Sequence, residues 1–140
     1  MDYFGLKNKM KKVDQNLIDA AENGDLKQVK ACLAAGADVH AAGNEEDSDD
    51  ALGCAAANGH LKVVKLLIKH GADIHVDDSY AIRRAAGNGN LEVVKLLIKH
   101  GADIHALNNW ATWSAAANGH LKTVKLLIKP GADIHACADY

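Results

Sequence analysis

A block of 18 residues recurs along the chain, and this repetition constrains the fold more than any other feature. The stretch NGHLKVVKLLIKHGADIH at residues 58 to 75 returns as NGNLEVVKLLIKHGADIH at 88 to 105 and as NGHLKTVKLLIKPGADIH at 118 to 135. The period is therefore 30 residues. A fixed period of this size indicates a supersecondary unit that buries its apolar face by stacking on copies of itself.

A degenerate first copy precedes these three. It reads NGDL at residues 23 to 26 and GADVH at residues 36 to 40. Asn23 lies 35 residues before Asn58, so five residues are inserted between Val39 and Ala51.

Each copy predicts two short helices. In the second helix, at residues 61 to 69, Lys62, Lys65 and Lys69 form one polar stripe and the other positions are almost all apolar. The first helix is built on paired alanines and ends at a glycine, after which Asp25 and Asn90 are suited to cap the second helix. Helices of this length are too short to be stable alone, so we expect an all-α solenoid ordered by stacking.

The pattern AAxxGHLxxVKLLIxxGADIHA, which covers residues 14 to 136, resembles the ankyrin repeat. The resemblance implies helix-turn-helix repeats, each followed by an outward loop. It also implies a concave surface, formed by the loop tips and first helices, that binds another protein. We expect a basic segment at 1–13, an ankyrin-repeat domain at 14–140 with repeats at about 14–40, 50–75, 80–105 and 110–135, and an acidic insertion at 41–50.

The repeats depart from this family in two ways. The period is 30 rather than about 33 residues, so short loops are expected at 75–81 and 105–111. The family's Thr-Pro-Leu-His is replaced by DALG at 50 to 53, YAIR at 80 to 83 and WATW at 110 to 113. Short repeats with an aromatic residue in the threonine position are similar to those of large DNA viruses and amoeba-associated microbes.

Positions that differ between copies are the candidates for partner contact, because they are free of a packing role common to all copies. They are Asp78, Ser79, Tyr80, Arg83 and Arg84 in the third copy and Asn108, Asn109, Trp110 and Trp113 in the fourth. Tryptophan, tyrosine and arginine are enriched at binding hot spots. Alternatively, Tyr80 and Trp110 fill the space of the missing threonine and pack between repeats, whereas Arg83 and Trp113 are predicted to be exposed.

Two further sets of residues are candidate contacts. Asn88 and Asn118 recur at a position that the resemblance places on the concave side, although an asparagine there would equally satisfy main-chain groups at a helix end. The insertion is rich in carboxylates, which could bind a basic partner, although such a run is also typical of a solvated loop. The candidates there are Glu45, Glu46, Asp47 and Asp49.

Composition argues against several other classes of protein. The chain has 140 residues, 49% hydrophobic content and a net charge of −2, with no apolar run long enough to cross a membrane. We therefore expect a cytoplasmic protein (in a host cytoplasm if the source is a virus or intracellular microbe) that binds neither nucleic acid nor membranes. Cys32, Cys54 and Cys137 show no metal-binding spacing and are expected to be buried thiols.

Histidines raise the alternative of a metal-binding or enzymatic protein that uses its His-rich loops. His40, His75, His105 and His135 would form a ladder along the stack. Neighbouring helices pack about 8 to 10 Å apart, too far for their histidines to share one zinc ion. No catalytic motif is present, so we expect no enzyme activity, no metal site and no cofactor. A third possibility is a structural piece of a longer array.

The last repeat is expected to lack a polar capping repeat. Tyr140 falls in the position of Tyr80 and Trp110, and nothing polar caps the apolar residues of the helix at 121–129. We therefore expect either a homodimer through this C-terminal repeat or fraying of its helices. Pro130 should shorten the final turn, because the residue before a proline avoids helical geometry.

Overall fold

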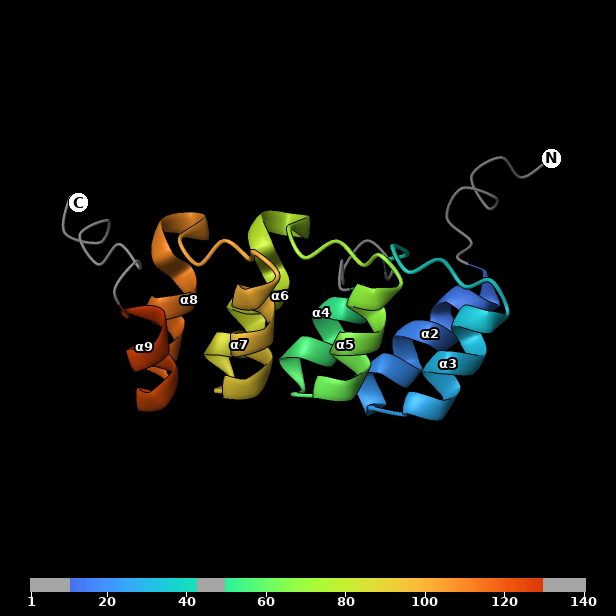
Figure 1. Cartoon of the computed structure of the whole chain (residues 1–140), viewed down its shortest axis with the longest axis horizontal. Coiled ribbons are helices and arrows are strands. Elements are labelled where there is room, and N and C mark those ends of the chain that lie inside the picture. The colour runs from blue at the N-terminus through green and yellow to red at the C-terminus, as the bar shows by residue number, and fades with distance from the viewer. Residues whose placement is uncertain (1–10, 43–49, 130–140) are drawn as a thin grey trace.

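The computed structural model describes residues 11–42 and 50–129, and within them the chain forms a row of paired helices (Figure 1). The first helices of the four repeats are α2 (Lys12–Asn23), α4 (Ala51–Ala57), α6 (Val76–Gly87) and α8 (Ala106–Ala117). The second helices are α3 (Leu26–Ala34), α5 (Leu61–Lys69), α7 (Leu91–Lys99) and α9 (Leu121–Leu127). The described residues contain no helix long and apolar enough to cross a membrane.

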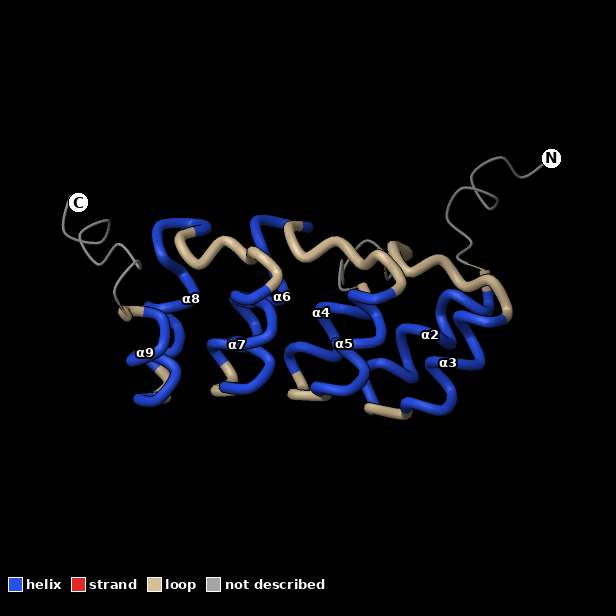
Figure 2. The backbone as a smooth tube through the Cα atoms, viewed as in Figure 1, coloured by secondary structure: helices blue, strands red, loops and turns tan. Residues whose placement is uncertain are grey.

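Each helix packs against its partner within the repeat and against its equivalent in the next repeat. Thus α2, α4, α6 and α8 form one layer, and α3, α5, α7 and α9 form the other (Figure 2). The predicted all-α solenoid is confirmed.

The core combines alanines and the large residues Leu17, Leu52 and Ile82 of the first helices with branched residues of the second helices. Ala55, Ala85 and Ala115 are fully buried in successive repeats, and Leu67 and Leu97 are buried opposite them. Alanine in the first helix lets the second helix approach closely, and the leucine side chain supplies most of the buried apolar area.

The second helices are exposed to solvent along the predicted lysine stripe. Every lysine of α5, α7 and α9 is exposed. Helix α9 ends at Leu127, whereas α5 and α7 continue to Lys69 and Lys99, the equivalents of Lys129. The predicted shortening of the last turn before Pro130 is confirmed.

The capping predictions are half correct. The Asp25 carboxylate accepts a hydrogen bond from the Gln28 amide at 3.1 Å, as a capping residue should. The prediction for Asn90 is wrong, since its side chain makes no capping bond to α7. Its amide group instead donates to the carbonyl oxygens of Ala56 and Ala57 in the preceding repeat, at 3.0 and 2.8 Å.

The loops predicted at 75–81 and 105–111 are largely absorbed into the first helices. Helices α6 and α8 begin directly after His75 and His105. The tight turns require left-handed backbone, with φ of 60° at Ser79 and of 50°, 57° and 63° at residues 107, 108 and 109. A connection shortened to a 30-residue repeat leaves no room for a projecting loop, so the chain turns within the helix start.

The acidic insertion lies at the first junction of the stack, between the first and second repeats. Ala42 and Asp50, near its two ends, form an isolated antiparallel bridge. Asp50, in the position of the family's threonine, caps α4, because its carboxylate accepts the Gly53 amide at 2.8 Å.

Candidate functional site

Tyr80 organises the charged part of the candidate site on α6. The guanidinium carbons of Arg83 and Arg84 each lie 5.4 Å from the centre of its ring, and Arg84 donates a hydrogen bond to the Tyr80 hydroxyl. Cation–π contacts of this kind fix the direction of a long side chain. Two positive groups are therefore held together beside one half-buried ring.

Trp110 and Trp113 form the apolar part of the site on α8. Their ring centres lie 4.9 Å apart with the planes inclined by 37°. Trp110 is 44% exposed and Trp113 is 59% exposed, so both rings present area to solvent. Exposure of two adjacent tryptophans is uncommon for a surface without a binding role, because their burial is strongly favourable.

The repeat register explains what Tyr80 contacts. A Cβ placed on Gly53 would lie 3.2 Å from the Tyr80 ring, so Tyr80 packs across the junction between the second and third repeats. The alternative that Tyr80 fills space between repeats is thus supported. Trp113 occupies the position of Gly53 in the last repeat, and therefore borders the side on which a following repeat would stack.

Burial removes two candidates from the surface that a partner touches. Ser79 is 2% exposed and Asn109 is 3% exposed. The Ser79 hydroxyl accepts a hydrogen bond from the Asp103 amide at 3.3 Å, and the Asn109 carbonyl oxygen bonds to a ring nitrogen of His105. Different polar side chains can make hydrogen bonds within this turn. That explains the variation at these positions without contact with a partner.

Asn88 and Asn118 are exposed, but their amide groups are engaged. Asn88 donates to the carbonyl oxygen of Ala57 at 2.8 Å, and Asn118 donates to those of Gly87 and Ser114, both at 3.0 Å. Each asparagine thus ties a helix end of one repeat to the next, and Asn118 also makes the predicted local bond. A partner would contact the outer surface of these side chains.

The structure describes only some of the remaining candidates. Asn108 is exposed in the first turn of α8, and Asp78 belongs to α6 although its side chain lies outside the described part. Glu45, Glu46, Asp47 and Asp49 lie outside the described residues, so their proposed role in partner contact stays a prediction.

The repeated Asp-Ile-His and Asp-Val-His segments serve the backbone of each loop. In three successive repeats the aspartate accepts a hydrogen bond from the main-chain amide of the histidine two residues on, at 2.8 to 2.9 Å; the acceptors are Asp38, Asp73 and Asp103. The carboxylates thus close a turn. Among residues 11–42 and 50–129 there is no group of three or more His, Cys, Asp or Glu that could hold a metal ion.

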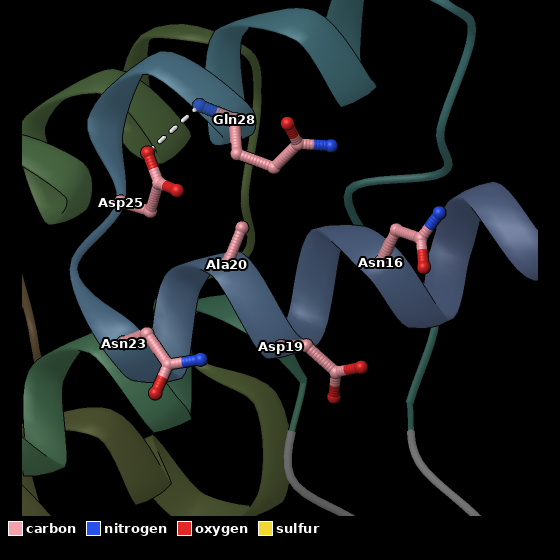
Figure 3. Close-up of a pocket in the computed structure, with 6 residues that line it drawn as sticks. All are labelled: Asn16, Asp19, Ala20, Asn23, Asp25 and Gln28. Atoms are coloured by element: carbon pink, nitrogen blue, oxygen red, sulfur yellow. Dashed lines mark hydrogen bonds between the residues drawn. The ribbon is translucent and has the colours of Figure 1, made fainter.

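A hollow of about 290 Å³ opens on the first repeat, lined by polar side chains from α2 and the start of α3 (Figure 3). Asn16, Asp19 and Asn23, on α2, line one side of the hollow. The hydrogen bond between Asp25 and Gln28 lies on its other side. Asn16, Asp19 and Gln28 are exposed, whereas their equivalents 35 residues later, Ala51, Cys54 and Val63, are buried against the first repeat. This is the polar surface expected of an N-terminal capping repeat.

Sequence reasoning missed one set of contacts between repeats, made by the residue that follows glycine at positions 60, 90 and 120. A ring nitrogen of His60 lies 2.8 Å from the carbonyl oxygen of Glu22 in the preceding repeat, and Asn90 makes the equivalent contact to the carbonyl oxygen of Ala57. The signal was present, since a histidine or asparagine follows glycine at residues 60, 90 and 120.

The comparisons with known proteins agree with this geometry. A family model described as ankyrin repeats (3 copies) matches residues 17–108 and 78–137, which together span most of the chain. A search of curated protein sequences found no match. With its stacked helix pairs and a family match over most of its length, the chain belongs to the ankyrin-repeat family.

Proposed function

We propose that this protein binds another protein through a surface that we call the aromatic–arginine surface. It consists of Tyr80, Arg83, Arg84, Trp110 and Trp113 on α6 and α8. Ankyrin repeats generally act as protein-protein interaction modules and are typically non-catalytic. The observation that supports this surface is the pair of exposed tryptophans, 4.9 Å apart, at positions that differ from copy to copy.

The chemistry of the surface suits a protein partner. Two rigid indole rings offer a large contact area at low entropic cost, and the neighbouring guanidinium groups offer directed donors. Asn88, Asn118, Asn108 and Asp78 lie on or next to the same helices and would form its polar rim. The acidic residues of the insertion, Glu45, Glu46, Asp47 and Asp49, would add contacts to a basic segment of the partner.

We place this activity in the cytoplasm. Cys32 is a buried free thiol, as expected in a reducing compartment.

Affinity capture with the wild-type chain and three alanine variants tests the proposal. Trp113→Ala and Arg83→Ala should each weaken binding of a captured partner by about 2 kcal/mol or more. Lys62→Ala, on the opposite lysine stripe, is the control and should bind normally. Full binding by both surface variants, with unchanged melting, would exclude this surface.

Melting curves of the same variants separate a binding defect from a folding defect. Trp113 is more than half exposed, so its removal should change the free energy of unfolding by less than about 1 kcal/mol. A variant that unfolds would show that the residue belongs to the core.

A further inference from the structure

Contacts between the first helices of successive repeats follow a fixed offset along the chain. A Cβ on Gly53 would lie 3.2 Å from the Tyr80 ring, and one on Gly87 would lie 2.6 Å from the hydroxyl oxygen of Ser114. In both pairs the second residue follows the first by 27 positions. The offset therefore holds at two successive junctions, α4 with α6 and α6 with α8, whose helices lie side by side (Figure 1).

The same offset joins the two parts of the aromatic–arginine surface. Arg83 lies one turn before Gly87 on α6, and Trp110 lies one turn before Ser114 on α8. Since positions 83 and 110 are also 27 residues apart, Trp110 lies beside Arg83. The guanidinium carbon of Arg83 is in turn 5.4 Å from the centre of the Tyr80 ring. The charged and the aromatic side chains thus form one continuous strip across the junction.

The strip is basic at its α6 end. Within α4, α6 and α8, Arg83 and Arg84 are the only charged side chains that the structure describes. Arg84 is exposed, and its hydrogen bond to the Tyr80 hydroxyl fixes the direction of the guanidinium group. Because this group carries five N–H donors, Arg84 can bond to Tyr80 and also bind a carboxylate. Charge complementarity therefore favours a partner with an acidic side chain opposite α6.

The tryptophan pair forms an apolar platform at the α8 end of the strip. The ring centres of Trp110 and Trp113 are 4.9 Å apart, so the rings touch and no third ring fits between them. Both rings are exposed and therefore project from α8. A partner helix is about 10 to 12 Å wide and is bound in a groove, whereas a thin extended segment can lie across projecting rings.

The spacing of the repeats selects the conformation of that segment. Arg83 and Trp113 hold equivalent positions in adjacent repeats, whose helices pack about 8 to 10 Å apart. A polyproline II segment has three residues per turn and rises about 3.1 Å per residue, so side chains three positions apart share one face at a separation of about 9 Å. In a β-strand, neighbouring side chains on one face are only about 6.6 Å apart. Polyproline II geometry therefore matches the repeat and β geometry does not.

From the charge and the spacing we infer that the aromatic–arginine surface binds an acidic, proline-containing segment of its partner in the polyproline II conformation. A carboxylate of the segment bonds to the guanidinium groups on α6, and a proline three positions away packs on the indole rings of α8. Proline suits this contact because its ring adds apolar area without a flexible side chain and fixes the extended backbone. The inference rests on the proposed function and names the kind of segment that the surface takes.

Selection from a random dodecapeptide library displayed on phage, with the full chain as bait, tests the inference. Sequences enriched on wild type over Trp113→Ala should carry Asp or Glu three positions from a proline. A synthetic peptide of the leading sequence should bind Arg84→Gln about tenfold more weakly, because a charge-assisted hydrogen bond is lost. Arg83→Gln is a second variant of the same kind and keeps the test valid if Arg84→Gln fails to fold.

The matched control removes positive charge from the other layer of the stack. Lys62, Lys65 and Lys69 are exposed on α5, and their combined replacement by alanine should leave the affinity for the peptide unchanged. Melting curves of Arg84→Gln should match those of wild type, since the Arg84 side chain is exposed. A weaker affinity then reports on the contact and not on folding.

Three outcomes would overturn the inference. Enriched peptides that need Trp113 but carry no acidic residue would show that the guanidinium groups do not select the partner. Acidic peptides that bind both glutamine variants normally, but not the lysine variant, would place the contact on the lysine stripe. A library without any Trp113-dependent sequence would exclude a short extended segment as the ligand. The proposed function fails by a different result, which is full capture of a partner protein by Trp113→Ala and Arg83→Ala.

Discussion

The imidazole ring of His60 lies against the Cα atom of Gly24, and this contact closes the junction between the first and second repeats. A Cβ at Gly24 would stand 2.5 Å from the Nδ1 atom of His60. The other ring nitrogen lies 2.8 Å from the carbonyl oxygen of Glu22. The side chain of Asn90 lies equally close to Gly59, and that of His120 to Gly89. Glycine is therefore needed at these positions for the packing of one repeat on the next as well as for the helix end.

Gly24→Ala should destabilise the chain more than Gly119→Ala. Both glycines have positive φ, of 72° and 76°, so alanine costs about 1 kcal/mol at either site. At Gly24 the ring of His60 must also move and lose its bond to Glu22, which adds at least about 1 kcal/mol. At Gly119 nothing lies within 4 Å of the new methyl group. Equal shifts of the urea midpoint in the two variants would contradict this account.

Backbone amide exchange should be slowest in the middle of the stack. Helix α7 packs between α5 and α9, whereas α3 and α9 each contact a single second helix among the described residues. Opening of an end repeat breaks one junction, and opening of an inner repeat breaks two. Amides of Leu91–Lys99 should therefore exchange more slowly than those of Leu26–Ala34 and Leu121–Leu127. The reverse order, measured by mass spectrometry, would argue against nearest-neighbour stacking.

Leu107→Asn should stabilise the fold. Leu107 has φ of 50°, a left-handed conformation that leucine adopts at a cost and asparagine tolerates. The side chain is 51% exposed, so little apolar contact is lost. We expect a gain of about 0.5 to 1 kcal/mol in the free energy of unfolding. Leu107→Ala, which keeps the strain, should give no gain in the same melting experiment.

Asp14→Ala should loosen the first repeat. Asp14 is 7% exposed, and its carboxylate accepts the Asp38 amide at 2.8 Å. Removal leaves that amide without its acceptor, which costs about 1 to 3 kcal/mol. Asp14→Ser should restore part of the loss, because Ser79 makes the equivalent bond to Asp103. Asp19→Ala, at an exposed site, is the control; a similar loss there would indicate a general charge effect.

Most of the secondary structure was predictable because it is local. The 30-residue period and the glycines at the helix ends predicted four helix pairs, and the structure has them. Pro130 predicted the early end of α9 through a steric effect confined to its neighbour. The exposed lysines of the second helices followed from their helical spacing.

The candidate surface was predictable in composition but not in detail. Trp113 was expected to be exposed and is, whereas Ser79 and Asn109 were chosen for the same reason and are buried. Variation between copies marks both a surface position and a buried turn that accepts several polar residues. Sequence alone does not separate these two cases.

The sequence by itself determined the family and the stacking order, because each depends on residues at fixed spacing along one repeat. Tertiary structure decided which side chains cross a junction. Asn90 was expected to cap its own helix, yet it bonds to the helix end of the preceding repeat. The choice depends on which carbonyl oxygen lies within reach, and that distance is set by the packing of one repeat on the next.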